Sequence, residues 1–81
     1  MDSVMLHLMN DDYNHHMDVE TALKQVCSME EEIAQVTAMI AHTTGYCPIF
    51  EGNADEAKTL QEKLEDMGIN TQITEVGSDP L

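Results

Sequence analysis

The sequence predicts a small α+β domain in which three helices pack on one face of a three-stranded sheet, in the order β-α-α-β-α-β. Three observations lead to this fold class. The chain has 81 residues, which is enough for one domain with a thin core. Apolar residues recur with the period of a strand near the start of the chain, and three later segments carry the period of a helix. Strands and helices in this order favour helices gathered on one side of a small sheet.

The first strand is expected near residues 4–9, where Val4, Leu6 and Leu8 alternate with other side chains. Two of the alternating residues are methionines, so this strand is expected to have cover on both faces. The strand should stop at residues 10–12, because Asn-Asp-Asp readily hydrogen-bonds its own backbone and favours turns.

The first helix is expected from about Met17, with an apolar face of four residues: Val19, Ala22, Leu23 and Val26. Ser28 and Glu31 have the spacing of a capping box, which predicts the start of a second helix. Gly45 is the residue type that most readily ends such a helix in the left-handed conformation.

The second helix carries two distinct non-polar sides. The larger side chains form one face: Ile33, Val36, Thr37 and Ile40. The small residues form another side and would let a neighbouring backbone approach closely: Ala34, Ala38 and Ala41. Because His42 lies roughly opposite Ile40, we expect it to point away from the main core.

The second half of the chain is predicted to add a strand, a helix and a strand. Pro48 lacks an N–H and should confine the strand at residues 46–51 to an edge of the sheet or to an irregular extension. Asn53 should cap a helix that Gly68 ends, and residues 69–76 should form the last strand. The helix has an apolar stripe of four residues: Ala57, Leu60, Leu64 and Met67. The domain is therefore expected to span residues 1–76, with residues 77–81 as a flexible tail.

The charge is strongly acidic, with a formal net charge of −13 from 16 acidic residues, three lysines and no arginine. Such a chain repels phosphate backbones and anionic membrane surfaces, so neither nucleic acid nor a membrane is an expected partner. No apolar run approaches the roughly 18–20 residues that cross a bilayer, and the start lacks the basic end of a signal peptide. We expect a cytoplasmic protein whose charge serves either to attract a cationic ligand or basic partner, or to suit salty surroundings.

Salt is expected to stabilise the fold. Added ions screen the mutual repulsion of the acidic side chains over a Debye length of about 10 Å at 0.1 M. The melting temperature should therefore rise from low to moderate NaCl, as followed by circular dichroism. A melting temperature that stays flat or falls would contradict self-repulsion as a major destabilising term.

Catalysis and tightly bound metals are not expected. Cys27 and Cys47 are too few for a disulfide framework and fit no zinc spacing. Neither cysteine has a histidine within helical reach, which argues against a Cys/His hydrolase. The cluster of Asp, Asn and His at residues 11–16 leaves a divalent-metal site open as a minor alternative, although no consistent ligand spacing supports it. We expect no enzyme and no cofactor.

Four segments resemble one known family. They are Leu8-Met9-Asn10-Asp11-Asp12-Tyr13-Asn14, then Leu23-Lys24-Gln25-Val26-Cys27 preceded by Val19, then Met39-Ile40-Ala41-His42-Thr43-Thr44-Gly45, and finally Leu64-Glu65-Asp66-Met67-Gly68-Ile69. The chain resembles the ClpS family, adaptors that deliver N-degron substrates to the Clp unfoldase–protease. The likeness covers nearly all of residues 3–76. Its most specific part is the Asn-Asp-Asp triplet followed 32 residues later by a histidine that stands three positions before a glycine.

The resemblance implies a site for the free amino terminus of another protein. Asn10, Asp11 and His42 match the residues that contact the degron's α-amino group and first peptide unit in ClpS-like proteins. The first side chain of the degron would enter an apolar pocket, and by position its walls are Asn14, His16, Val19, Ala38, Met39 and Ala41. Without the resemblance, Asn10 and Asp11 would read as turn or cap residues, and His42 as a partner of the helix dipole.

The resemblance also implies two kinds of partner: N-degron peptides or proteins, and the N-terminal domain of a Clp AAA+ ATPase. Docking to the ATPase would involve the third helix, with Glu56 and Lys58 as candidate residues, although Asn53 stands where the family usually has glutamate. The protein is expected to act as a monomer. A stand-alone acidic interaction module on the same fold, without N-degron delivery, is the alternative, because a fold by itself does not fix a function.

Three further features depart from the family pattern. Family members usually have methionine at the positions of both Ala38, at the pocket entrance, and His16, in its wall. The sequence therefore predicts a pocket that is more open to bulky or β-branched first residues. Nine residues precede Asn10, whereas many ClpS proteins have a longer arm there, so delivery is expected to be weaker or differently arranged.

Overall fold

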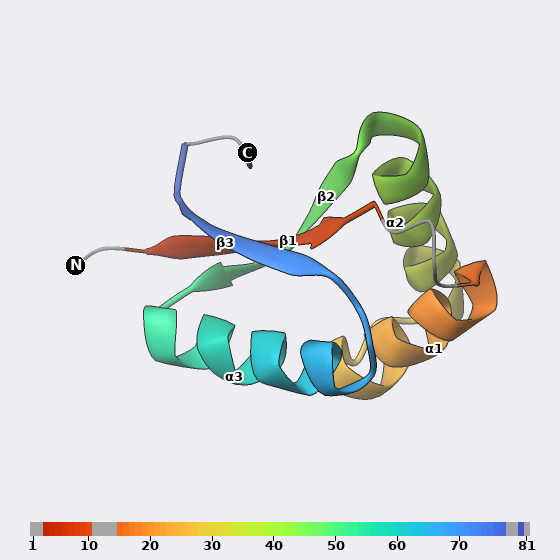
Figure 1. Cartoon of the computed structure of the whole chain (residues 1–81), viewed down its shortest axis with the longest axis horizontal. Helices are drawn as coiled ribbons and strands as arrows, with labels where there is room; N and C mark the ends of the chain where they lie inside the picture. Colours follow the sequence, from red (N-terminus) through yellow and green to blue (C-terminus); the bar gives the residue numbers. More distant parts are fainter. Residues whose placement is uncertain (1–2, 11–14, 78–79, 81) are drawn as a thin grey trace.

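A computed structural model describes residues 3–10, 15–77 and 80 of the chain. It contains the predicted elements in the predicted order (Figure 1). The elements are β1 (Val4–Met9), α1 (His16–Cys27), α2 (Glu31–Thr44), β2 (Tyr46–Gly52), α3 (Ala54–Asp66) and β3 (Thr71–Glu75). Among the helices described, none has the length and apolar character needed to span a membrane.

The sheet has the order β2-β1-β3, and both pairs of neighbouring strands are antiparallel. The prediction that Pro48 confines its strand to an edge is confirmed, because β2 is an outer strand. The pairing with β1 shifts at this point: Leu6 lies opposite Phe50, whereas His7 lies opposite Pro48, so Ile49 is an extra residue. A bulge of this kind bends and twists a strand locally.

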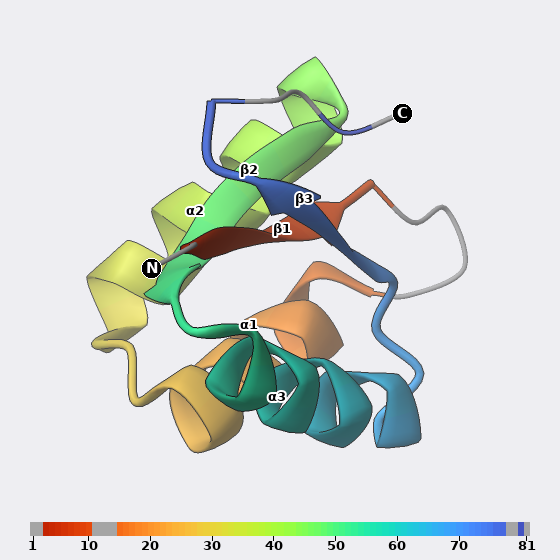
Figure 2. The ribbon, with the colours of Figure 1, turned by 90° about the vertical axis from the view of Figure 1, so that its left-hand side faces the viewer.

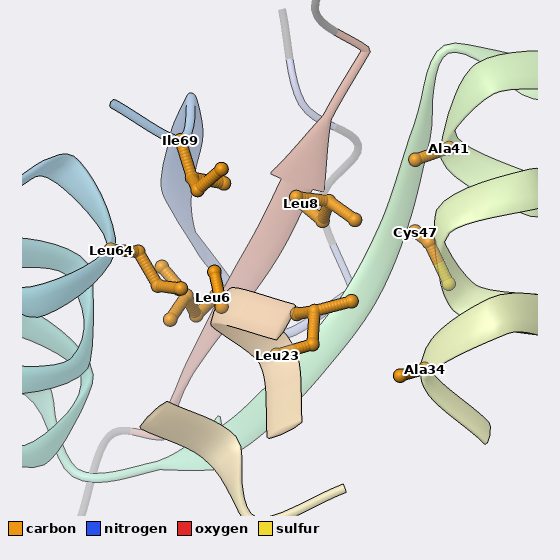
Figure 3. Packing of buried hydrophobic residues seen from close by; sticks show 9 residues of the cluster. Leu6, Leu8, Leu23, Ala34, Ala41, Cys47, Leu64 and Ile69 are labelled. Atoms are coloured by element: carbon orange, nitrogen blue, oxygen red, sulfur yellow. The ribbon is translucent and has the colours of Figure 1, made fainter. Parts of the chain in front are cut away.

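The helices cover one face of the sheet, as Figure 2 shows from the side. The core lies between the two layers and contains four fully buried leucines from three elements (Figure 3): Leu6, Leu8, Leu23 and Leu64. Ile69, just after α3, closes one end of this cluster. The two leucines of β1 are neighbours on the covered face, so the central strand supplies the middle of the core.

A polar side chain of β1 is also buried, on the face of the sheet that points away from the helices. His7 is only 3% exposed, and its Nε2 lies 2.9 Å from the Thr74 hydroxyl oxygen on β3. Its ring meets that of Tyr46 edge-on, with 5.6 Å between the ring centroids. The expectation that β1 has cover on both faces is thus met at His7.

The orientation of α2 differs from the one expected for its large side chains. Its buried residues are the small ones and one threonine: Ala34, Thr37, Ala38 and Ala41. Ile33, Val36 and Ile40 are instead 54%, 55% and 41% exposed. The helix packs against β2 and α1, and Figure 3 shows Ala34 and Ala41 pointing toward the strands. Small side chains occupy the inner face of α2 because they let its backbone approach the sheet. The leucines of other elements already fill the core.

The start of α2 was also predicted wrongly. Ser28 has φ 56°, and its backbone N–H bonds the Leu23 carbonyl, so it ends α1 instead of beginning α2. The residue before α2 is Glu30, whose side chain makes no capping hydrogen bond. A residue in the left-handed conformation satisfies the last carbonyls of a helix, and this requirement at the end of α1 takes precedence over the capping-box spacing.

Two other caps confirm their predictions. Asn53 caps α3, since its side-chain Oδ1 accepts a hydrogen bond of 2.7 Å from the Glu56 backbone N–H. Gly45 ends α2 with φ 102°, a conformation that costs glycine little because it has no Cβ. The Gly45 N–H in turn bonds the Ala41 carbonyl at 2.9 Å.

Candidate functional site

The end of β1 is tied directly to the end of α2. The backbone N–H of Asn10 donates a 2.8 Å hydrogen bond to the carbonyl oxygen of Gly45. The Thr44 hydroxyl strengthens the same junction, because it lies 2.7 Å from the Ile40 carbonyl and 3.0 Å from the Tyr46 carbonyl. Two segments that are 35 positions apart in the sequence are thereby held side by side.

His42 lies in the last turn of α2, three residues before Gly45. This separation is about 4.5 Å along a helix axis, so the imidazole is within one turn of the Asn10 junction. The side chains of Asn10 and His42 are both exposed. The prediction that His42 points away from the main core is confirmed, and the junction brings these two predicted site residues to the same end of α2.

The electrostatics of this end favour a cation. The carbonyl end of a helix carries a partial negative charge of roughly half an electron. The three lysines of the chain belong to α1 and α3, so β1, α2 and β2 contribute none. An exposed amide side chain, an imidazole and helix carbonyls together offer acceptors for a group with several N–H donors.

Three of the predicted pocket residues lie on inward-facing surfaces. Ala38 and Ala41 are 4% and 3% exposed on the inner face of α2. Val19 on α1 is half-buried and packs against the core cluster. Met39 is 61% exposed, so it lies on the outer side of α2 and not beside the two alanines.

The remaining predicted residues of this site lie outside what the structure describes. Asp11 and Asn14 are in the segment 11–14, and only the backbone of His16, the first residue of α1, is described. The metal alternative at residues 11–16 falls mostly in the same segment. Within the described residues, no group of three or more His, Cys, Asp or Glu side chains could hold a metal ion.

A hollow of about 480 Å³ lies elsewhere, between the end of α1, β2 and the start of α3. Its apolar lining is Val26, Cys27, Ile49, Phe50 and Leu60. Asp55 and Glu56 add carboxylates, and Glu56 is one of the predicted docking residues. Lys58 is exposed on the same helix. No local sequence pattern predicts this hollow, because its lining comes from three elements.

The two cysteines have the properties of structural thiols. Cys47 is buried and Cys27 is half-buried, and both are free. Burial raises the pKa of both thiols, which keeps them protonated at neutral pH. An activated cysteine nucleophile needs the opposite shift.

Together these features describe a small α+β domain with polar acceptors at the carbonyl end of one helix and an apolar hollow on another side. The chain belongs to the ClpS family: the family model described as "ATP-dependent Clp protease adaptor protein ClpS" matches residues 2–76. Members of this family are adaptors of a protease and not proteases themselves.

A solved structure agrees with the family assignment. Agrobacterium tumefaciens ClpS2, in a structure bound to L-phenylalaninamide, is similar to this chain with a TM-score of 0.84 and 25% sequence identity. The similarity covers 91% of this chain and 96% of the other. A search of curated proteins gave no match. The predicted family and fold class are therefore both confirmed.

Proposed function

We propose that this protein is an adaptor that binds substrates with a free hydrophobic N-terminal residue and delivers them to a Clp AAA+ unfoldase–protease. The observation that carries the proposal is the Asn10–Gly45 hydrogen bond. It places the exposed Asn10 beside the negative end of α2, within one turn of His42.

The ligand of the similar A. tumefaciens ClpS2 has the chemistry that such a site requires. L-phenylalaninamide combines a free α-amine, an aromatic side chain and an amide where the next peptide unit would be. An α-amine has a pKa near 7.7–8.0, so at pH 7 it is mostly an ammonium with three donors. In this protein Asn10 would offer its amide oxygen, Asp11 its carboxylate and His42 a ring nitrogen.

The first side chain of the substrate would lie against Val19, Ala38 and Ala41. Each Å² of apolar surface that such a contact removes from water contributes roughly 25 cal/mol to the binding free energy. Small walls leave room, so a pocket with two alanines should accept larger first residues than one with bulkier walls. Asn14 and His16 complete the proposed set of pocket residues, whereas Met39, which is 61% exposed on the outer side of α2, is left out of it.

Ala38→Met is expected to shift preference among first residues. The longer side chain would narrow the entrance, so the affinity for Ile, Val and Trp N-termini should fall relative to that for Leu and Phe, by about tenfold for a contact worth about 1.4 kcal/mol. Titration of peptides that differ only in the first residue measures this ratio. Ala54→Met controls for the added side chain, because Ala54 is an exposed residue in the first turn of α3. An unchanged ratio would contradict Ala38 as a gate.

Delivery would use a different surface from recognition. Glu56 and Lys58 on α3 are the proposed contacts with the N-terminal domain of the Clp ATPase. The hollow that Glu56 helps to line supports this assignment, since an apolar depression beside carboxylates is a good receptor for a partner side chain. Recognition at the α2 terminus and docking at α3 could then occur at once.

The test is the affinity for a peptide that begins with phenylalanine, measured by fluorescence anisotropy for wild type and Asp11→Asn. The substitution keeps the shape of the side chain but removes its charge, so the affinity should fall at least about tenfold, since a hydrogen bond to a charged group is worth about 1.5–3 kcal/mol. Asp66→Asn, which makes the same change at the end of α3, should leave the affinity unchanged. Equal losses in both variants would mean that only net charge matters. Degradation of a Phe-initiated reporter by the Clp protease then tests delivery separately.

A further inference from the structure

We propose that the exposed apolar stripe of α2, formed by Ile33, Val36 and Ile40, binds a basic amphipathic helix of a partner protein. This site is separate from the proposed amine site and from the α3 docking surface. The three side chains are 54%, 55% and 41% exposed, although they are among the large aliphatic residues of the chain. Figure 1 shows α2 at the periphery of the molecule, and its buried alanines take the opposite, sheet-facing side.

The spacing of the stripe suits a helix as the occupant. Positions 33, 36 and 40 are separated by three and four residues, which aligns them along one side of a helix. Side chains at these spacings form the ridges that fit the grooves of a second helix. The stripe extends over about two turns, long enough to guide a partner helix along α2.

The charge around the stripe indicates what kind of helix fits. From Ile33 to Thr44 the sequence has no Asp, Glu, Lys or Arg, so the stripe can be covered without burying a charge. Three consecutive acids stand directly before it, Glu30, Glu31 and Glu32, and all are exposed. Glu31 lies 3.8 Å from the Lys24 ammonium, while its own side chain stays 70% exposed. A partner helix with apolar residues along one face and lysine or arginine at one end would match both the apolar stripe and the acidic cluster beside it.

The same charge argues against a second copy as the occupant. Two copies would each bring a net charge of −13 to the interface, together with a second Glu30-Glu31-Glu32 cluster. Like charges brought together oppose association, whereas a cationic partner is attracted from a distance and held at the acidic end.

The experiment uses the full chain and a synthetic amphipathic helix of leucine and lysine, about four turns long, with an acetylated N-terminus. Acetylation removes the free amine, so this probe tests the stripe independently of the proposed amine site. Binding is measured by fluorescence anisotropy. Ile33→Ser/Val36→Ser should weaken binding about tenfold, as expected when roughly one buried aliphatic side chain's worth of contact is lost. Glu30→Gln/Glu32→Gln should reduce the dependence of the affinity on NaCl.

The matched control is Met67→Ser/Val76→Ser, because these two residues are exposed to a similar degree, at 40% and 46%, away from α2. It should leave the affinity within about twofold, as substitutions outside the contact usually do. Equal loss in both double variants would overturn the proposal, as would displacement of the probe by L-phenylalaninamide. If a helix of leucine and glutamate bound as tightly as the helix of leucine and lysine, the proposal of a basic partner would be overturned. A wild-type dimer in sedimentation that Ile33→Ser/Val36→Ser converts to monomer would assign the stripe to a second copy instead.

Discussion

A peptide that begins with phenylalanine is expected to bind about 100-fold more weakly once its N-terminus is acetylated. Acetylation removes the positive charge and two of the three donors of the ammonium. Each hydrogen bond between a charged and a neutral group is worth about 1.5–3 kcal/mol, and about 1.4 kcal/mol changes an affinity tenfold. If two of the hydrogen bonds to Asn10, Asp11 and His42 are lost, the affinity for the peptide should therefore fall by a factor of about 100 or more. Calorimetric titration of the two peptides measures it.

The control peptide carries the same acetyl group on the side chain of an internal lysine. It has the same net charge as the N-acetylated peptide, so the general attraction of an acidic protein for cations is equal in both. Only the N-terminal modification should abolish tight binding. Similar affinities for the two acetylated peptides would instead support the stand-alone interaction module, because binding by such a module does not require a free α-amine.

The fold was largely predictable because the elements carry local signals. Alternation in β1, helical periods in α1 and α3, the Asn53 cap and the Gly45 terminus each depend on residues close together in the sequence. The errors arose where tertiary context decided between two local options. Ser28 could begin one helix or end another, and its φ of 56° shows that it ends α1.

The candidate site was predictable only in part from residue chemistry. Asn10 and Gly45 are far apart in the sequence, and no local pattern states that the end of β1 hydrogen-bonds the end of α2. The family resemblance grouped Asn10 with His42 as site residues, and the structure brings Asn10 to the α2 terminus that bears His42. Exposure separates Met39 from Ala38 and Ala41, a distinction that adjacent sequence positions conceal. The hollow beside α3 shows the same difficulty, since it forms only when three elements pack together.

A buried leucine of α3 and an exposed isoleucine of α2 together give a test of stability. Leu64→Ala is expected to destabilise the fold by about 2–5 kcal/mol, because Leu64 is fully buried and its truncation leaves a cavity. For a domain of this size each kcal/mol shifts the melting temperature by about 4–8 °C, so a fall of about 8–40 °C should follow. The substitution does not lower the helix propensity of α3, since alanine is the best helix former. Thermal unfolding followed by circular dichroism gives the shift.

Ile33→Ala is the matched comparison, since it also truncates a large aliphatic residue to alanine within a helix. Ile33 is 54% exposed on the outer side of α2, so its loss should change the stability by no more than about 0.5 kcal/mol. Had the large side chains of α2 faced the core, as their periodicity alone predicts, both substitutions would cost several kcal/mol. A large loss for Ile33→Ala would therefore mean that α2 presents its isoleucines to the sheet. A small loss would leave Ile33 available for a partner.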